Sequence, residues 1–224
     1  MDYFEYMREA IRTEADDFKG MVGRLSVCVG NPLRLLHAAL GLADEVGELA
    51  AAVEDRAVGK PFDDVNLKEE LGDLLWYVAI GCDALQTNMY RAAEVYWNQR
   101  ASENRRKTIG ATLSFSYFEG DDKEYQDRLL YGLLSLSVDV GRAVSHMKRH
   151  IVYGTKLDPV EMLVGFGGVV YAVHELVNLK GWAIEEIMEL NIAKLRTRYP
   201  DRFVDIKAIH RDVDAERRVL EGKE

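Results

Sequence analysis

The chain has 224 residues, of which 38 are acidic and 29 basic, giving a formal net charge of −9. This charge argues against nonspecific binding of nucleic acid, because neutralising phosphates requires a basic surface. The chain is 48% hydrophobic and can bury a substantial core, and its four prolines interrupt few of the long helix-forming runs, which favours an all-α protein.

Cysteine use and hydropathy point to a reduced, cytoplasmic protein. Cys28 and Cys82 form no metal-binding or redox spacing. We find no stretch of about 18 apolar residues and no N-terminal signal pattern, so we expect neither a membrane span nor secretion.

The predicted elements begin with an amphipathic helix over residues 3–19. A glycine-punctuated connector at 20–31 follows, and Pro32 is placed to start the next helix. The periodicity then predicts three helices, over residues 33–57, 65–85 and 90–106. Residues 108–122 break the helical pattern and are predicted to be a linker, with a short extended piece at 112–118.

The organisation then repeats. Gly47 aligns with Gly141, an offset of 94 residues, and Gly72 aligns with Gly167, an offset of 95. We predict a duplication, with one repeat over residues 1–107 and a second over 123–224. The alignment places the glycine-rich segment GFGG (165–168) inside a helix, which indicates close helix packing rather than a phosphate-binding loop.

Four acidic residues stand out in the first repeat. Glu45 and Glu48 are three residues apart on one predicted helix, and Glu70 and Asp73 are three apart on the next, so each pair has neighbouring side chains. Asp73 precedes the uncharged run 74–80 with no cation close to it in the sequence.

Four carboxylates at the edge of a core repel one another and are costly to desolvate, whereas a divalent cation removes both problems. Hard oxygen ligands suit Mg²⁺, with Mn²⁺ as a substitute. We therefore expect Asp73→Asn to leave the fold equally or slightly more stable. The alternative, acids on solvated helix faces, would be preferred for Glu45 and Glu48 alone.

The second repeat lacks most of these acids. The positions aligned with Glu45, Glu48, Glu70 and Asp73 are occupied, in that order, by Asp139, Arg142, Gly165 and Gly168. One carboxylate cannot hold Mg²⁺, so we expect a single metal site per chain.

The pattern Glu-x-x-Glu followed by Glu-x-x-Asp resembles the metal signature of the MazG-like all-α nucleoside triphosphate pyrophosphohydrolases. The segments that carry the resemblance are HAALGLADEVGEL (37–49), EELGDLLWYVA (69–79) and NIAKLRTRYPDRF (191–203). The flanks, FEYMREAIRTEA (4–15) and HRDVDAERRVLEG (210–222), look like those of phage and bacterial members. The resemblance covers most of the chain outside the linker.

The resemblance implies that Glu45, Glu48, Glu70 and Asp73 hold one to three Mg²⁺ ions. It also implies hydrolysis of a nucleoside triphosphate at the α-phosphorus, with Glu48 a candidate to accept the water's proton. Residues that would contact the substrate are Tyr77, Asn98, Arg105, Asn191, Lys194, Arg198 and His37. For Tyr77 a core position, and for His37 a capping position, is the structural alternative.

Family members of the ordinary kind carry the acids and an Asn-x-x-Lys-x-x-x-Arg helix in one short domain and assemble as dimers or tetramers. Here the acids lie in the first repeat, whereas Asn191, Lys194 and Arg198 lie in the second, and Ala101 replaces the lysine in the first. We interpret the chain as a covalent pseudo-dimer, and a homodimer of pseudo-dimers is compatible with this interpretation. The helix of the second repeat either completes a shared site by contacting the substrate phosphates or is kept for packing.

Two other functions are compatible with the sequence. A dimeric-type dUTPase is also an all-α, internally repeated chain of similar length. A non-catalytic nucleotide-binding module would retain the scaffold without turnover, although the complete acid set in the first repeat argues against it.

Overall fold

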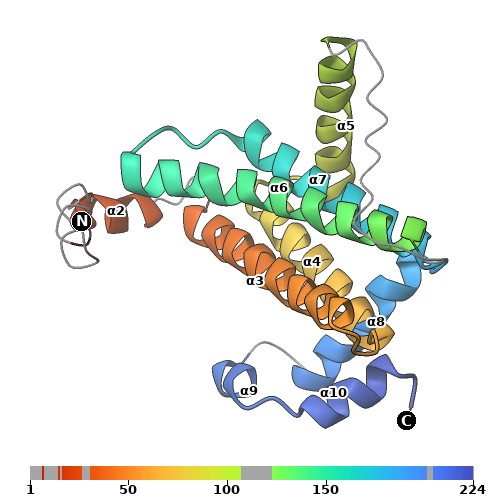
Figure 1. Ribbon diagram of the computed structural model, residues 1–224. Helices are drawn as coiled ribbons and strands as arrows, with labels where there is room; N and C mark the ends of the chain where they lie inside the picture. The colour runs from red at the N-terminus through yellow and green to blue at the C-terminus, as the bar shows by residue number, and fades with distance from the viewer. Residues whose placement is uncertain are drawn as a thin grey trace.

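Figure 1 shows a computed structural model of the protein, which describes Met7, Ala15 and residues 17–26, 31–106, 123–200 and 204–223. Every secondary-structure element in these residues is an α-helix, which confirms the all-α class. The predicted linker at 108–122, its extended piece and most of the predicted helix 3–19 lie outside the described residues.

The helices of the first half follow the predicted bounds closely. α3 (Pro32–Ala57), α4 (Asp64–Ala84) and α5 (Met89–Arg106) each begin and end within one residue of the expectation. Local capping explains this agreement: the Asn31 side chain accepts a hydrogen bond from the Arg34 amide at 3.3 Å, and Asp63 accepts one from the Val65 amide at 3.0 Å.

The connector predicted at 20–31 was wrong in its first part, because α2 (Phe18–Leu25) occupies it. The side chain of Asp17 accepts a hydrogen bond from the Gly20 amide at 2.9 Å and caps this helix. A capped start therefore outweighs the low helix propensity of the two glycines.

The second half has three long helices, α6 (Lys123–Tyr153), α7 (Pro159–Leu179) and α8 (Ile184–Arg198), then the short helices α9 (Asp205–Ile209) and α10 (Val213–Leu220). The segment GFGG lies inside α7, as predicted. α7 is long and apolar enough to cross a membrane, contrary to our expectation that no such stretch exists. Most of it is buried against its neighbours, as in the central helix of a soluble protein.

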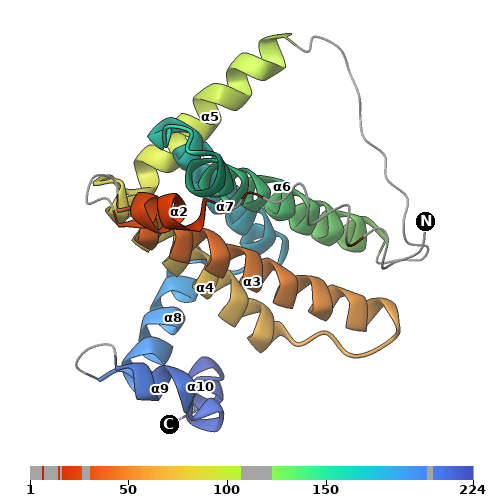
Figure 2. The same cartoon turned by 90° about the vertical axis from the view of Figure 1, so that its left-hand side faces the viewer.

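Figures 1 and 2 show how the helices pack. α3 lies along α4 and α6, and α6 lies along α7. The third helix of each half crosses to the other half: α5 packs on α7, and α8 packs on α4. In both views α5 stands at one end of the bundle, and α8 to α10 stand at the opposite end. This exchange is what a pseudo-dimer would show, but the duplication and its domain bounds stay predictions.

Candidate active site

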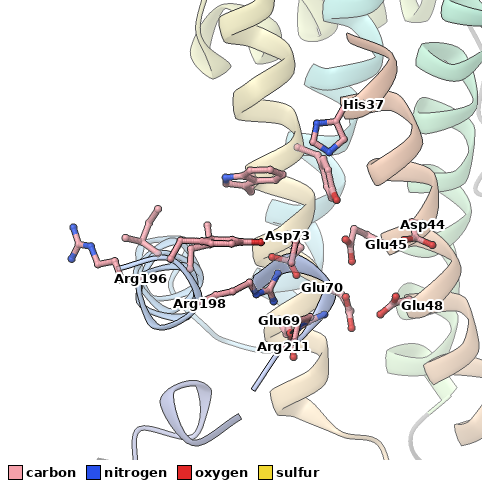
Figure 3. Close-up of a pocket in the computed structure, with 16 residues that line it drawn as sticks. His37, Asp44, Glu45, Glu48, Glu69, Glu70, Asp73, Arg196, Arg198 and Arg211 are labelled. Carbon is pink, nitrogen blue, oxygen red and sulfur yellow. Dashed lines mark hydrogen bonds and ion pairs between the residues drawn. The ribbon is translucent and has the colours of Figure 1, made fainter. Parts of the chain in front are cut away.

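A pocket of about 660 Å³ lies where α3, α4 and α8 meet the C-terminal segment. Figure 3 shows the side chains that line it. They are His37, Asp44, Glu45, Glu48, Glu69, Glu70, Asp73, Trp76, Tyr77, Ile192, Leu195, Arg196, Arg198, Tyr199, Ala208 and Arg211. Carboxylates and guanidinium groups dominate the charged lining, so the pocket suits a ligand that is held through both a cation and its own negative charge.

Three of the four predicted acids converge. Glu45 from α3 and Glu70 and Asp73 from α4 each offer one carboxylate oxygen, and these oxygens all lie within 4.8 Å of one another. Glu45 is 8% exposed and Glu70 is 3% exposed, which makes them two of the few buried charged side chains in the described structure. Hard oxygen donors at this separation, in a partly enclosed pocket, fit Mg²⁺.

Bringing these carboxylates together disfavours their charged forms. Burial raises the pKa of both Glu45 and Glu70 above their ordinary value, and the negative charges of neighbouring acids raise them further. The contact between the two carboxyl groups raises the pKa of Glu70 and lowers that of Glu45.

Asp73, in contrast, has a cation. Lys194 of α8 donates to Asp73 Oδ2, and Asn191 Nδ2 donates to Asp73 Oδ1 at 2.6 Å. Lys194 is fully buried and lies 3.2 Å from Glu69 Oε1 as well. A cation distant in the sequence therefore neutralises Asp73 in the folded protein. The effect of Asp73→Asn on stability stays a prediction, but this contact now favours a loss, since the change would leave a buried lysine with Glu69 alone.

Close helix packing makes this contact geometrically feasible. A Cβ atom on Gly72 would lie 2.8 Å from Cβ of Asn191, so only glycine lets α8 approach α4 at this point. The aligned residue in the second repeat, Gly167, receives α5 in the same way, with the carbonyl oxygen of Ala92 2.1 Å from the position of its absent Cβ.

Glu48 lines the pocket one turn of α3 beyond Glu45, and it is exposed. It does not belong to the cluster of three converging oxygens, but it lines the same pocket. Asp44, which the sequence analysis did not single out, also lines the pocket from α3.

Aromatic rings form one end of the pocket. The ring centroids of His37 and Tyr77 are 5.6 Å apart, and those of Trp76 and Tyr77 are 4.9 Å apart, all in edge-to-face arrangements. Burial raises the pKa of Tyr77 to about 12, with the nearby Glu45 adding to the effect, so its hydroxyl stays protonated. His37 and Tyr77 therefore line the same pocket as the acids, and their contact with the substrate stays a prediction. Trp76 was missed because it reads as a core aromatic.

The structure does not bring Asn98 into this pocket. It is an exposed residue of α5, and α5 packs on α7 at the other end of the bundle. Arg105 lies on the same helix, and its side chain is outside the described part of the structure. Of the two Asn-x-x-Lys/Ala-x-x-x-Arg helices, the one in the second repeat meets the acids.

The C-terminal segment contributes residues that sequence reasoning missed, because the segment reads as a charged tail. Arg211 lines the pocket, and Glu216, on α10, is 2% exposed. Glu216 pairs with both Arg198 and Arg211. One feature of the sequence could have indicated that Glu216 is buried: it lies four residues before Leu220, on the same side of α10, and Leu220 is the other buried residue of this helix.

In the second repeat, the positions that align with the four acids leave no room for a second carboxylate cluster. Asp139 is buried, and its Cγ lies 2.2 Å from where a Cβ on Gly168 would stand. Arg142 lies 3.7 Å from Asp139 and offers a cation where the first repeat has Glu48. An acidic side chain therefore has no room at Gly168 without displacing Asp139.

The free energy of unfolding of the metal-free protein is expected to fall as pH rises from about 4.5 through the raised pKa values of Glu45 and Glu70. The folded state holds a proton that the unfolded state has released, so the unfolded state gains relative stability with each step up in pH. Melting temperatures in EDTA between about pH 5 and about pH 8 measure this.

Added Mg²⁺ should reduce that slope, because the ion replaces the proton. The Glu45→Gln/Glu70→Gln double variant serves as the control, since it has no acid pair to ionise and should lose most of the slope. An equally steep slope in this variant would show that other groups cause it.

Comparison with known proteins agrees with the geometry. Residues 35–98 match the family model described as the MazG nucleotide pyrophosphohydrolase domain. The match covers most of α3, all of α4 and part of α5, and it includes all four acids of the predicted metal site. Searches of curated proteins and of solved structures found no match. Over residues 35–98, this chain is therefore similar to the MazG nucleotide pyrophosphohydrolase domain.

Proposed function

We propose that this protein is a cytoplasmic, Mg²⁺-dependent enzyme that hydrolyses nucleoside triphosphates at the α-phosphorus and releases nucleoside monophosphate and pyrophosphate. The observation that carries the proposal is the convergence of Glu45, Glu70 and Asp73 in a pocket that also contains arginines, within a MazG domain. When bound, Mg²⁺ would supply charge neutralisation at the phosphates and a lowered pKa for the attacking water.

The residues of the chain have separate roles in this proposal. Glu45, Glu70 and Asp73 hold the cation, and Glu48, exposed to the pocket, accepts the proton of the attacking water. Lys194 and Asn191 orient Asp73 from the other side. The rings of Trp76, Tyr77 and His37 provide a surface against which a flat base can pack.

The decisive experiment incubates the protein with each of the eight common ribo- and deoxyribonucleoside triphosphates and Mg²⁺ and separates the products by chromatography. Monophosphate and pyrophosphate in equal amounts support the proposal. Turnover of dUTP alone would identify a dUTPase, and binding without turnover would indicate a nucleotide-binding module; either result contradicts the proposal as stated.

Asp139→Asn and Glu45→Gln form a matched pair for the same assay, because they change aligned acids in the two repeats. We expect Asp139→Asn to keep kcat/KM within about threefold of the unchanged protein, because Asp139 does not line the pocket and a substitution outside the site has little effect on catalysis. Glu45→Gln should lose nearly all activity because it removes a metal ligand. Equal losses in the two variants would mean that the second repeat contributes a working site.

A further inference from the structure

The C-terminal segment places a pair of arginines at the edge of the acidic pocket. Arg198 Nε donates to Glu216 Oε1 at 2.8 Å, and Arg198 Nη2 donates to Glu216 Oε2 at 2.5 Å. Arg211 Nη2 donates to the same Oε2 at 2.7 Å. Two planar guanidinium groups are thus fixed side by side on one buried carboxylate, that of Glu216.

Arg211 also connects this pair to α4. Its Nη2 lies 3.2 Å from Glu69 Oε1, the same oxygen that Lys194 contacts. Both Arg198 and Arg211 line the pocket. Arg211 belongs to the loop before α10 and Arg198 to the end of α8, so the pair forms only when the C-terminal segment is docked against the bundle.

Three groups of side chains follow one another along the pocket. His37 on α3 packs against Tyr77 on α4 at one end, Glu45 lies beside Asp73 and Glu70 in the middle, and Glu69 meets Arg211 at the other end. Figure 3 shows this order, with His37 and Arg211 on opposite sides of Asp73. His37 precedes Glu45 by eight residues, so the aromatic end lies about 12 Å along the helix from the acids.

A nucleoside triphosphate hydrolysed at its α-phosphorus has the same order. The base and sugar lie on one side of the reacting phosphorus, and the β- and γ-phosphates lie on the other. With the α-phosphorus at the carboxylate cluster and the base against the aromatic rings, the β- and γ-phosphates extend toward the two arginines.

The resemblance already implies that Arg198 contacts the substrate. We propose that Arg211 joins it in binding the β- and γ-phosphates, and that Glu216 is a positioning residue that holds both guanidinium groups for this contact. The inference rests on the proposed function for the identity of the substrate. Planar guanidinium groups bind phosphate oxygens through two parallel hydrogen bonds, which a single lysine cannot do.

The test is titration of the metal-loaded protein with pyrophosphate and, separately, with nucleoside monophosphate, followed by calorimetry. Arg211→Ala should raise the Kd for pyrophosphate about ten- to a hundredfold and leave the Kd for monophosphate unchanged. Glu216→Gln should raise the Kd for pyrophosphate in the same selective way, because the neutral amide no longer fixes both arginines.

Arg217→Ala is the matched control. Arg217 holds the same segment down through Asp63 at 2.7 Å and Glu221 at 2.9 Å and does not line the pocket. It should leave both Kd values unchanged. Arg211→Lys retains the charge without the planar fork and should recover part of the pyrophosphate binding, which excludes misfolding as the cause of the loss.

Two results would overturn the inference. One is pyrophosphate binding in Arg211→Ala that equals that of the unchanged protein; the other is an equal loss of monophosphate binding. If the unchanged protein hydrolyses triphosphates while Arg211→Ala binds pyrophosphate normally, this inference fails alone. If it hydrolyses no triphosphate, the proposed function fails, and the substrate assigned to the arginines fails with it.

Discussion

Glu70→Gln is expected to abolish Mg²⁺-dependent hydrolysis, with a loss of about a thousandfold or more in kcat, because metal assistance supplies several kcal/mol of transition-state stabilisation. Glu70 is buried at the centre of the carboxylate cluster, and an amide is a far weaker ligand for Mg²⁺ than a carboxylate. The assay is release of pyrophosphate from a triphosphate at saturating Mg²⁺.

The same variant should be more stable than the unchanged protein when no metal is present. Burial and the neighbouring acids disfavour the charged form of Glu70, and glutamine removes that charge while its amide can still donate to Glu45. Melting temperatures in EDTA near pH 8 measure the effect, at about 2–4 °C per kcal/mol for a chain of this size. Normal turnover with unchanged helicity would show that Glu70 is not a metal ligand.

Lys194→Ala is expected to lower the free energy of unfolding of the metal-free protein by about 3–5 kcal/mol, because it removes one partner of a buried ion pair. Lys194 is fully buried and donates to Asp73 and Glu69, and alanine leaves both carboxylates without it. Urea denaturation in EDTA gives the loss directly. With Mg²⁺ present the loss should be smaller, because the ion then neutralises Asp73.

Lys68→Ala is the control for Lys194→Ala, since Lys68 also joins α4 to α8. It pairs with Glu186 at 2.5 Å, where Glu186 is exposed, so its removal should cost about 0–1 kcal/mol with or without Mg²⁺. A destabilisation in Lys194→Ala that is independent of Mg²⁺ would contradict the expectation that the ion can neutralise Asp73 when the lysine is gone.

Lys194→Ala also bears on the two alternatives that the sequence left for the helix 191–198, a shared site or a packing element. The structure shows that Lys194 contacts an acid of the predicted metal site and is buried in the helix interface at once. Stability and kinetics should therefore change together in this variant, whereas Arg211→Ala, on an exposed residue, should change the kinetics alone.

The sequence predicted α3, α4 and α5 well because their determinants are local. Apolar periodicity sets the buried side of each helix, and caps such as Asn31 and Asp63 set where the helices begin. The spacing of Glu70 and Asp73 likewise needs only helix geometry to place both carboxylates together. α2 was missed because its glycines suggest a connector, and its cap at Asp17 was not given enough weight.

The sequence by itself thus determined the helices and the acidic pairs, and the tertiary structure decided which distant residues meet them. Asn191 and Lys194 lie 118 and 121 residues after Asp73, and Arg211 lies 142 after Glu69, so no local pattern relates them. The choice of Asn191 over Asn98 depends on the crossing of α8 onto α4, which Gly72 permits. Charges pair according to distance in space, and that distance exists only once the helices have packed.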